Sequence, residues 1–197
     1  MRYDSKHKQQ TRTKVLKEAA ETIRSRGPEG IAVAGVMAKA GLTHGGFYAH
    51  FKSRDDLVAA AVDQMFEDSR TRLPRAAGEE NPAAALGNYI DRYLSPAHRD
   101  TRSAGCPLPF LSADMPRIGG AARERFSAGT AEIMSAFTDL LTRLGHGDPG
   151  AGASSMLAEL VGALALARAE PDPARSDVIL AHSRAALKRR FSLESQI

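Results

Sequence analysis

Apolar residues recur three and four positions apart along nearly the whole chain, and glycine or proline interrupts this pattern at intervals. Such spacing places the apolar side chains on one face of a helix, whereas a half-buried strand needs strict alternation of apolar and polar residues. No stretch of the sequence alternates convincingly, and the sequence contains no internal repeat. The pattern therefore predicts an all-α protein of about nine helices.

The expected helices can be placed from their caps and stops. They occupy about 7–26 and 33–40, then a two-turn helix capped by Thr43, a longer helix capped by Ser53 that ends near 72–74, and one capped by Asn81. A polar, turn-rich stretch over 95–104 precedes a short irregular helix within 105–111. Long helices follow at about 116–144, with a bend at its glycine pair, 151–169 and 174–191.

Residues 41–51 read GLTHGGFYAHF, which is unusual for a helix because two adjacent glycines each cost close to 1 kcal/mol relative to alanine. So short a helix is unstable alone, and packing through Phe47 and Phe51 must hold it. A helix, a glycine-led turn and a second short helix form the helix-turn-helix arrangement. Its second helix can enter a DNA major groove, where glycines permit close approach of the backbone.

Positive charge is concentrated at the N-terminal end of the chain. Residues 1–54 contain 11 Lys and Arg against 4 Asp and Glu, whereas the remainder contains 16 against 19. A basic segment joined to an acidic one is typical of a nucleic-acid-binding domain attached to a second domain, although a solvated helix face gives the same count.

The sequence also excludes several classes of protein. One cysteine cannot form an internal disulfide framework or a zinc finger. No apolar run reaches the roughly 20 residues of a membrane span, and the first residues lack the apolar segment of a signal peptide, so we expect a cytoplasmic protein. His44 and His50 have no third ligand nearby in sequence, so we predict no metal site and no cofactor.

The run AGLTHGGFYAHFKSRDDL, residues 40–57, resembles the DNA-binding signature of the TetR/AcrR transcriptional regulators. The resemblance is strong over residues 7–66 and extends beyond them only in helix number and length. It implies a DNA-binding domain over 1–54 and a ligand-binding and dimerisation domain over 55–197. One departure is that Ile31 and Ala32 stand where many relatives have a Thr or Ser that caps the second helix.

Carried over residue by residue, the resemblance implies contacts of two kinds with operator DNA. Thr43, His44, Gly45 and His50 would face the major groove. Tyr48 and Lys52 would hold phosphates, with Lys52 assisted by the amides at the helix end that follows it. The alternative is that Tyr48 and His50 only pack beside the two phenylalanines.

For the second half, the resemblance implies a homodimer formed by the last two helices and a small-molecule inducer that enters the helical bundle. Small and apolar residues in 157–167 suit a close helix–helix contact, although they also suit the core of a single subunit. The plausible pocket residues, which could equally be ordinary core, are Phe66, Tyr89, Tyr93, Phe110, Met115, Phe126, Met134 and Met156.

Cys106 is a candidate sensor thiol. It follows Gly105 where a short helix is expected to begin, near His98, Arg102 and Arg117, and both features would stabilise a thiolate. The GGFYAHF variant together with a mid-chain Gly-Cys pair is similar to family members that sense electrophiles or oxidants. The alternative is a buried, inert thiol.

Two other functional classes were weighed, an all-helical enzyme and a helical adaptor. The sequence has no metalloprotease, phosphate-loop or catalytic-triad motif, although triads assemble in space and leave little sequence signal. Neither class accounts for the basic, glycine-bearing N-terminal segment. We therefore expect a DNA-binding regulator, not an enzyme, and repression is the usual mode of the family.

Overall fold

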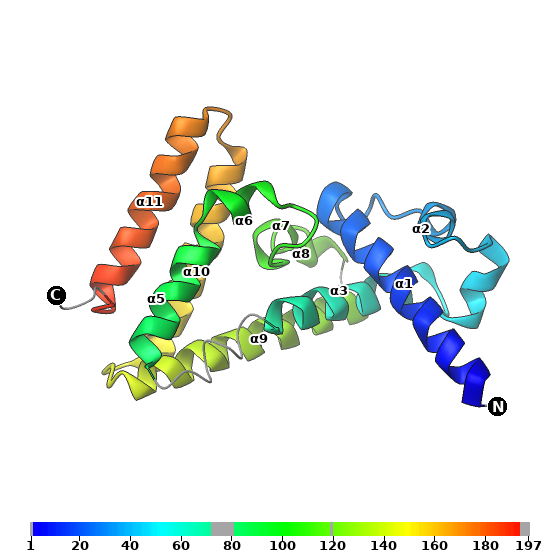
Figure 1. The fold of residues 1–197 in the computed structure, drawn as a ribbon, viewed down its shortest axis with the longest axis horizontal. Coiled ribbons are helices and arrows are strands. Elements are labelled where there is room, and N and C mark those ends of the chain that lie inside the picture. The colour runs from blue at the N-terminus through cyan, green and yellow to red at the C-terminus, as the bar shows by residue number, and fades with distance from the viewer. Residues whose placement is uncertain (1, 72–80, 119, 194–197) are drawn as a thin grey trace. The chain divides into compact units, whose positions relative to one another are not determined.

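The computed structural model describes residues 2–71, 81–118 and 120–193, with the side chains of residues 2–5 left out. In this part of the chain it has ten α-helices, one 3₁₀ helix and no strand (Figure 1). The all-α prediction is confirmed, and the helix count exceeds the expected nine because two short helices were missed. Contacts divide the chain into two compact units, Met1–Asp68 with Ser103–Gly129, and Ser69–Arg102 with Thr130–Ile197.

The first unit begins with α1 (Arg2–Arg26), which starts five residues earlier than expected. Its inner face buries Val15, Ala19 and Ile23, as the periodicity predicts. Gly27 ends the helix in the left-handed region, with φ +76°, and donates its amide to the Ile23 carbonyl at 2.8 Å. Only glycine adopts that conformation without strain, which is why the predicted stop is correct.

Helix α2 (Val33–Lys39) follows and packs against α1 through buried Val36 and Met37. Its N-cap, Ala32, makes no side-chain hydrogen bond, in agreement with the departure noted in the sequence. Gly41 ends it with φ +75°, and the Leu42 amide donates to the Met37 carbonyl at 2.9 Å. This bond closes the turn that leads into the next element.

The segment expected to be a two-turn α-helix is a 3₁₀ helix, η1 (His44–Ala49), which packs against α2. Thr43 stands at the predicted N-cap position with extended backbone, but its side chain makes no capping hydrogen bond. The Thr43 carbonyl instead accepts the Gly46 amide at 3.1 Å, a tighter i to i+3 bond. Glycines at the start of the segment weaken α-helical propensity, which explains the difference.

Helix α3 (Arg54–Arg70) begins as predicted at Ser53, whose hydroxyl accepts the Asp56 amide at 3.1 Å. The predicted stop at 72–74 lies outside the described residues. The first unit also contains α7 (Leu108–Leu111), α8 (Met115–Ile118) and the beginning of α9 (Gly120–Arg143). Gly129 lets α9 approach α3 closely, because a Cβ there would lie 2.3 Å from the Phe66 ring.

The expected continuous helix over 116–144 is therefore wrong: α8 ends at Ile118 and α9 begins at Gly120. Gly120 has φ +53°, a value that an unbroken helix cannot contain. The sequence predicts a bend at this glycine pair, whereas in the structure one helix ends there and another begins.

The second unit contains α5 (Pro82–Tyr93), α6 (Pro96–Asp100), most of α9, α10 (Pro149–Ala169) and α11 (Pro173–Arg190). Helices α10 and α11 run side by side, and α5 packs against both (Figure 1). Asn81, Asp148 and Asp172 cap their helices through side-chain oxygens, and proline occupies the first turn each time. The core here includes Leu86, Ile90, Phe137, Leu160 and Leu180.

Helix α6 corrects the prediction of a polar turn over 95–104. Ser95 caps it by accepting the His98 amide at 3.1 Å, and Pro96 supplies the first helical residue. A Ser-Pro pair is a helix-start signal that the charged composition concealed. The predicted functional boundary after residue 54 stays a prediction, since the two compact units follow contacts and not roles.

Candidate DNA-binding surface

The η1 segment is fixed to the protein by two phenylalanines. Phe47 and Phe51 are each 2% exposed, and their rings stack with centroids 5.6 Å apart. This confirms that tertiary packing holds so short a helix. Tyr48 contacts the edge of Phe47, with ring centroids 5.3 Å apart, yet 71% of it is exposed. The inner face of the segment is therefore anchored, while Tyr48 faces outward.

Most other predicted DNA contacts also reach the surface. Thr43, His44, Gly45 and Lys52 are exposed, and His50 is half-buried. A Cβ added at Gly45 would meet no atom within 4 Å, and one at Gly46 would make only ordinary contacts. Packing inside the protein therefore gives no reason for the two glycines. An external partner that approaches the backbone closely does.

His50 lies beneath the basic face of α1. Arg12 donates to the His50 carbonyl at 3.4 Å, and its guanidinium lies 4.4 Å from the centroid of the Phe51 ring. Burial, together with the positive charges of Lys8 and Arg12, lowers the pKa of His50 below its ordinary 6.5. The imidazole is therefore neutral at pH 7, and its buried Nδ1 has no hydrogen-bond partner among the described residues.

Arg12 is a contact that sequence reasoning did not single out. The available signal was its place on the basic face of the first helix, but that position does not reveal a partner 38 residues away. Arg12 contacts the residues that follow η1 through the His50 carbonyl and the Phe51 ring, and it adds a positive charge beside them.

The start of α3 adjoins this segment. Lys52 is exposed, while its backbone amide donates to the Asp56 carboxylate at 2.9 Å. The Asp56 amide in turn donates to Ser53. Two amides near this helix end are thus already satisfied by side chains, which leaves the Lys52 ammonium as the group available to an anion.

Arg54 is a second contact that the sequence did not reveal. Its Nη2 donates to the carbonyls of Pro28 and Glu29 at 2.8 and 3.3 Å, and its Nε donates to that of Ile31 at 3.1 Å. One guanidinium therefore fixes the α1–α2 turn to α3. The fork of parallel donors suits this role, which lysine could not perform.

The charge around η1 is available to an outside partner. Lysine side chains from α1 to the start of α3 form no ion pair among the described residues. They are Lys6, Lys8, Lys14, Lys17, Lys39 and Lys52. Unpaired lysines beside exposed hydrogen-bonding side chains are the arrangement that binds a phosphate backbone.

The predicted effector residues divide between the compact units. Phe66, Phe110, Met115 and Phe126 belong to the first, and Tyr89, Tyr93, Met134 and Met156 to the second. The rings of Phe66 and Phe126 form an edge-to-face pair with centroids 5.6 Å apart, and those of Tyr89 and Phe137 do so with centroids 5.3 Å apart. None of the eight lines the cavities of about 330 and 300 Å³ in the described chain, so their role in ligand binding stays a prediction.

Cys106 is 6% exposed and lies two residues before α7. Helix α7 has only four residues, so the macrodipole expected to stabilise a thiolate is small. Its role as a sensor stays a prediction. No group of three or more His, Cys, Asp or Glu within the described ranges could hold a metal ion.

Helix α10 is long and apolar enough to cross a membrane by length and composition alone. It packs against α5, α6 and α11, and about two thirds of its residues are buried or half-buried. One such helix is weak evidence of a membrane span, because a helix in the core of a soluble protein can have the same length and composition. It does not indicate a membrane protein.

Comparison with known proteins agrees with this geometry. Residues 15–61 match the model of the family described as bacterial regulatory proteins, tetR family. The HTH-type transcriptional repressor Rv3405c of Mycobacterium tuberculosis is 29% identical over 79 residues, 40% of each chain. The uncharacterized HTH-type transcriptional regulator YfiR of Bacillus subtilis is 22% identical over 104 residues, 53% of this chain and 50% of that one. The chain thus spans half or less of the curated relatives' length.

The fold likeness extends much further along the chain. A TetR transcriptional regulator from Chloroflexus aurantiacus superposes with a TM-score of 0.81 at 25% identity, covering 95% of this chain and 96% of that one. In its helix-turn-helix segment and in its fold, the chain is thus similar to transcriptional regulators of the TetR family.

Proposed function

We propose that the protein is a homodimeric, sequence-specific DNA-binding repressor that acts in the cytoplasm and leaves its operator when an inducer acts on it. The observation that carries the proposal is Tyr48, an exposed tyrosine on a segment anchored by buried Phe47 and Phe51. Apart from its edge contact with Phe47, this large aromatic side chain is exposed to water and contributes little to the stability of the fold. It is well suited to a phosphate contact at the edge of a major groove.

The proposed contacts separate affinity from specificity. Lys52 and Tyr48 bind phosphates, which fixes the register of the protein on the duplex. Thr43, His44 and His50 donate to or accept from base edges, and Gly45 brings the backbone close to them. Two copies related by two-fold symmetry place these groups in successive major grooves of a near-palindromic operator.

The proposed dimer forms through α10 and α11 of each copy. Leu166 on α10 is 63% exposed and Val178 on α11 is 50% exposed, which leaves apolar side chains uncovered on this helix pair. Ala158 and Gly162 leave room on α10 for a close helix contact, since a Cβ at Gly162 would meet no atom within 4 Å. These features support a four-helix interface.

The inducer shifts the population between two dimer geometries, only one of which fits the operator. One route is a small molecule that contacts aromatic and methionine residues of one compact unit, either Phe66, Phe110, Met115 and Phe126 or Tyr89, Tyr93, Met134 and Met156. The second is modification of Cys106, which an electrophile or an oxidant reaches only when the loop before α7 opens, because the thiol is buried.

The experiment is binding of the purified dimer to the DNA upstream of its own coding region over a salt series, compared with unrelated DNA. We expect selective binding that weakens steeply with salt. Tyr48→Ala should lose this binding while the dimer stays intact. Arg123→Ala, an exposed residue of α9, serves as the matched control. Unchanged binding by Tyr48→Ala would contradict the proposed surface.

The route of release is tested with the same DNA. If the thiol is the sensor, an oxidant or electrophile releases wild type but not Cys106→Ser. If both proteins respond alike, modification of Cys106 is not the signal. Release of both by the same reversible small molecule would then identify the ligand route.

A further inference from the structure

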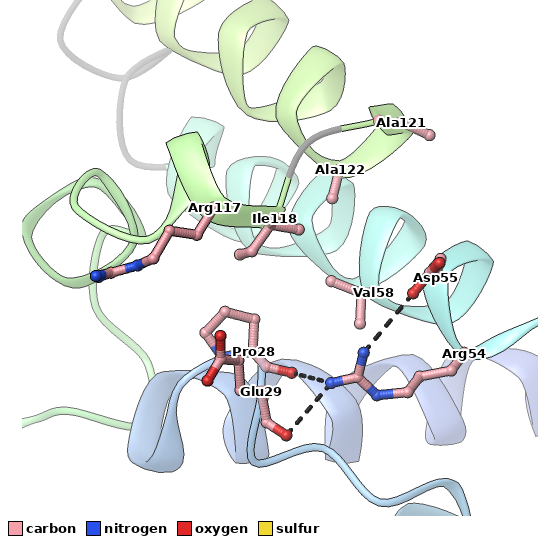
Figure 2. Close-up of a pocket in the computed structure, with 10 residues that line it drawn as sticks. Pro28, Glu29, Arg54, Asp55, Val58, Arg117, Ile118, Ala121 and Ala122 are labelled. Atoms are coloured by element: carbon pink, nitrogen blue, oxygen red, sulfur yellow. Dashed lines mark hydrogen bonds and ion pairs between the residues drawn. The ribbon is translucent and has the colours of Figure 1, made fainter.

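A cavity of about 330 Å³ lies within the first compact unit, and none of the predicted effector residues lines it. Its walls come from the α1–α2 turn, α3, α8 and the start of α9 (Figure 2). Its lining includes Arg54, Val58, Arg117, Ile118, Ala121 and Ala122. Its volume is at the small end of the range for ligand pockets, about 300–1,000 Å³.

One wall presents a guanidinium with an unused donor. The Nε and Nη2 of Arg54 are taken by carbonyls of the α1–α2 turn, as described above. Its Nη1 has only Asp55, at 3.7 Å, beyond hydrogen-bond distance, and the Asp55 side chain is 92% exposed. Because three carbonyls fix this guanidinium, an anion that binds Nη1 meets a donor already in place.

The rest of the lining separates into charge and apolar surface. Val58 and Ala122 are buried and, with half-exposed Ile118, supply hydrocarbon between Arg54 and a second cation, Arg117. The Nη2 of Arg117 donates to the Ala113 carbonyl at 3.3 Å and to Asp114 at 3.0 Å. Figure 2 shows Arg117 and Arg54 on different walls, with Val58 and Ile118 between them.

Two carboxylates also line the cavity, Glu29 and Asp55. Both residues are exposed, as are Arg54 and Arg117, so water screens all four charges. They offset the formal charge of the arginines, and Asp55 forms an ion pair with Nη1 at 3.7 Å without a hydrogen bond. The fixed donor and the hydrocarbon beside it therefore favour an anion with an apolar body.

We propose that this cavity binds a small organic carboxylate. Its carboxylate accepts from Nη1 of Arg54, its apolar body lies against Val58, Ile118 and Ala122, and Arg117 adds a second positive charge. Because Arg54 also holds the α1–α2 turn, the ligand acts on the element that positions α2. A resulting change in operator affinity rests on the proposed function, whereas binding itself does not.

The test uses the full-length protein without DNA and two probes, benzoate and its uncharged counterpart benzamide, titrated in amide NMR spectra. We expect benzoate to bind about tenfold or more tightly than benzamide, since only benzoate offers an ionised acceptor to the Arg54 guanidinium. Its shifts should gather at residues 28–31, 54–58 and 117–122. Equal affinity for the two probes, or shifts elsewhere only, would overturn the proposal.

Two variants with matched controls locate the site. Ala121→Leu adds three carbons to the lining of the cavity and should abolish benzoate binding, whereas Ala128→Leu, also exposed on α9 but outside the lining, should not. Arg117→Gln should weaken binding several-fold, and Arg123→Gln should leave it unchanged. Neither variant alters Arg54, so the clamped turn is preserved. Benzoate binding that survives Ala121→Leu would overturn the proposal, whether or not the protein binds an operator.

Discussion

The segment around η1 and the α10–α11 pair are both helical, yet they dispose of their charged and apolar groups in opposite ways. Around η1 the phenylalanines are buried and the lysines have no carboxylate partner among the described residues. On the α10–α11 pair, Lys188 donates to Asp91 of α5 at 2.6 Å, and Arg190 of α11 donates to Glu159 of α10 at 2.6 Å. These two cations are paired with carboxylates inside the protein, and Leu166 and Val178 are the exposed side chains instead.

This difference indicates two kinds of partner. Unpaired cations attract a polyanion, and their contribution weakens with salt. Exposed apolar side chains beside internally paired charges gain free energy only by contact with another apolar surface, such as a second copy of the same pair. The predictions below test whether the two regions are as distinct in function as they are in composition.

The largest effect should come from the anchor of η1. Phe47→Ala removes a buried ring and should lower the free energy of unfolding by about 3–5 kcal/mol, with loss of DNA binding. Tyr48→Ala should change stability by no more than about 0.5 kcal/mol, because Tyr48 is exposed. Urea unfolding of both variants checks this. Comparable destabilisation by the two would mean that Tyr48 is part of the core and not a free contact.

The outward apolar surface should matter for association. Leu166→Glu removes apolar burial worth about 1.5–3 kcal/mol per copy from the proposed interface, at least tenfold in dimer affinity. Sedimentation over a concentration series measures this. The control Ala131→Glu, on the exposed face of α9, should stay dimeric. If Leu166→Glu also remains fully dimeric, these exposed side chains do not mark the interface.

Much of this contrast could be predicted from sequence, and the exceptions have physical causes. Helical periodicity, the stops at Gly27 and Gly41 and the helix start at Asn81-Pro82 were predicted correctly, because local backbone preferences decide them. The 3₁₀ geometry of η1 was not predicted, although its glycines weaken α-helical propensity. The break before α9 was underestimated because a glycine pair does not by itself reveal that Gly120 adopts a positive φ.

For the candidate DNA-binding surface, too, the residues of a local motif were predicted and the contacts between distant residues were not. The six proposed DNA contacts came from a local motif, and five of them are exposed. Arg12 and Arg54 were missed because each binds a carbonyl that is more than 20 residues away along the chain. No periodicity or local motif encodes such a pairing. The cavity beside Arg54 was missed for that reason too, since four separate segments form it.

Replacing one lysine in each region tests the comparison through smaller changes in DNA binding and stability. Lys52→Gln should reduce the salt slope of operator binding by about 1 and leave stability nearly unchanged. Lys188→Gln breaks the pair with Asp91 and should lower the free energy of unfolding by about 0.2–1 kcal/mol without affecting the slope. Binding isotherms at several salt concentrations and urea unfolding distinguish them. A reduced slope for Lys188→Gln would place that charge on DNA and remove the distinction.

The smallest effect concerns His50, which belongs to the η1 region but is only half exposed. Its lowered pKa means that between that value and 6.5 the unfolded chain binds more protons than the native protein. Stability therefore falls as pH decreases through this window. His50→Gln should flatten the fall in the urea midpoint, whereas His44→Gln, which replaces an exposed neighbour, should not.

DNA binding should respond to pH in the opposite direction. A phosphate near His50 favours the imidazolium against the repulsion of Lys8 and Arg12, so binding takes up a proton. Operator affinity should then rise several-fold as the pH falls from about 7.5 to about 6, even as the free protein becomes less stable. His50→Gln should remove this rise and His44→Gln should retain at least part of it. If His50→Gln keeps the whole pH dependence, protonation of His50 does not contribute to DNA binding, and no phosphate lies near its imidazole.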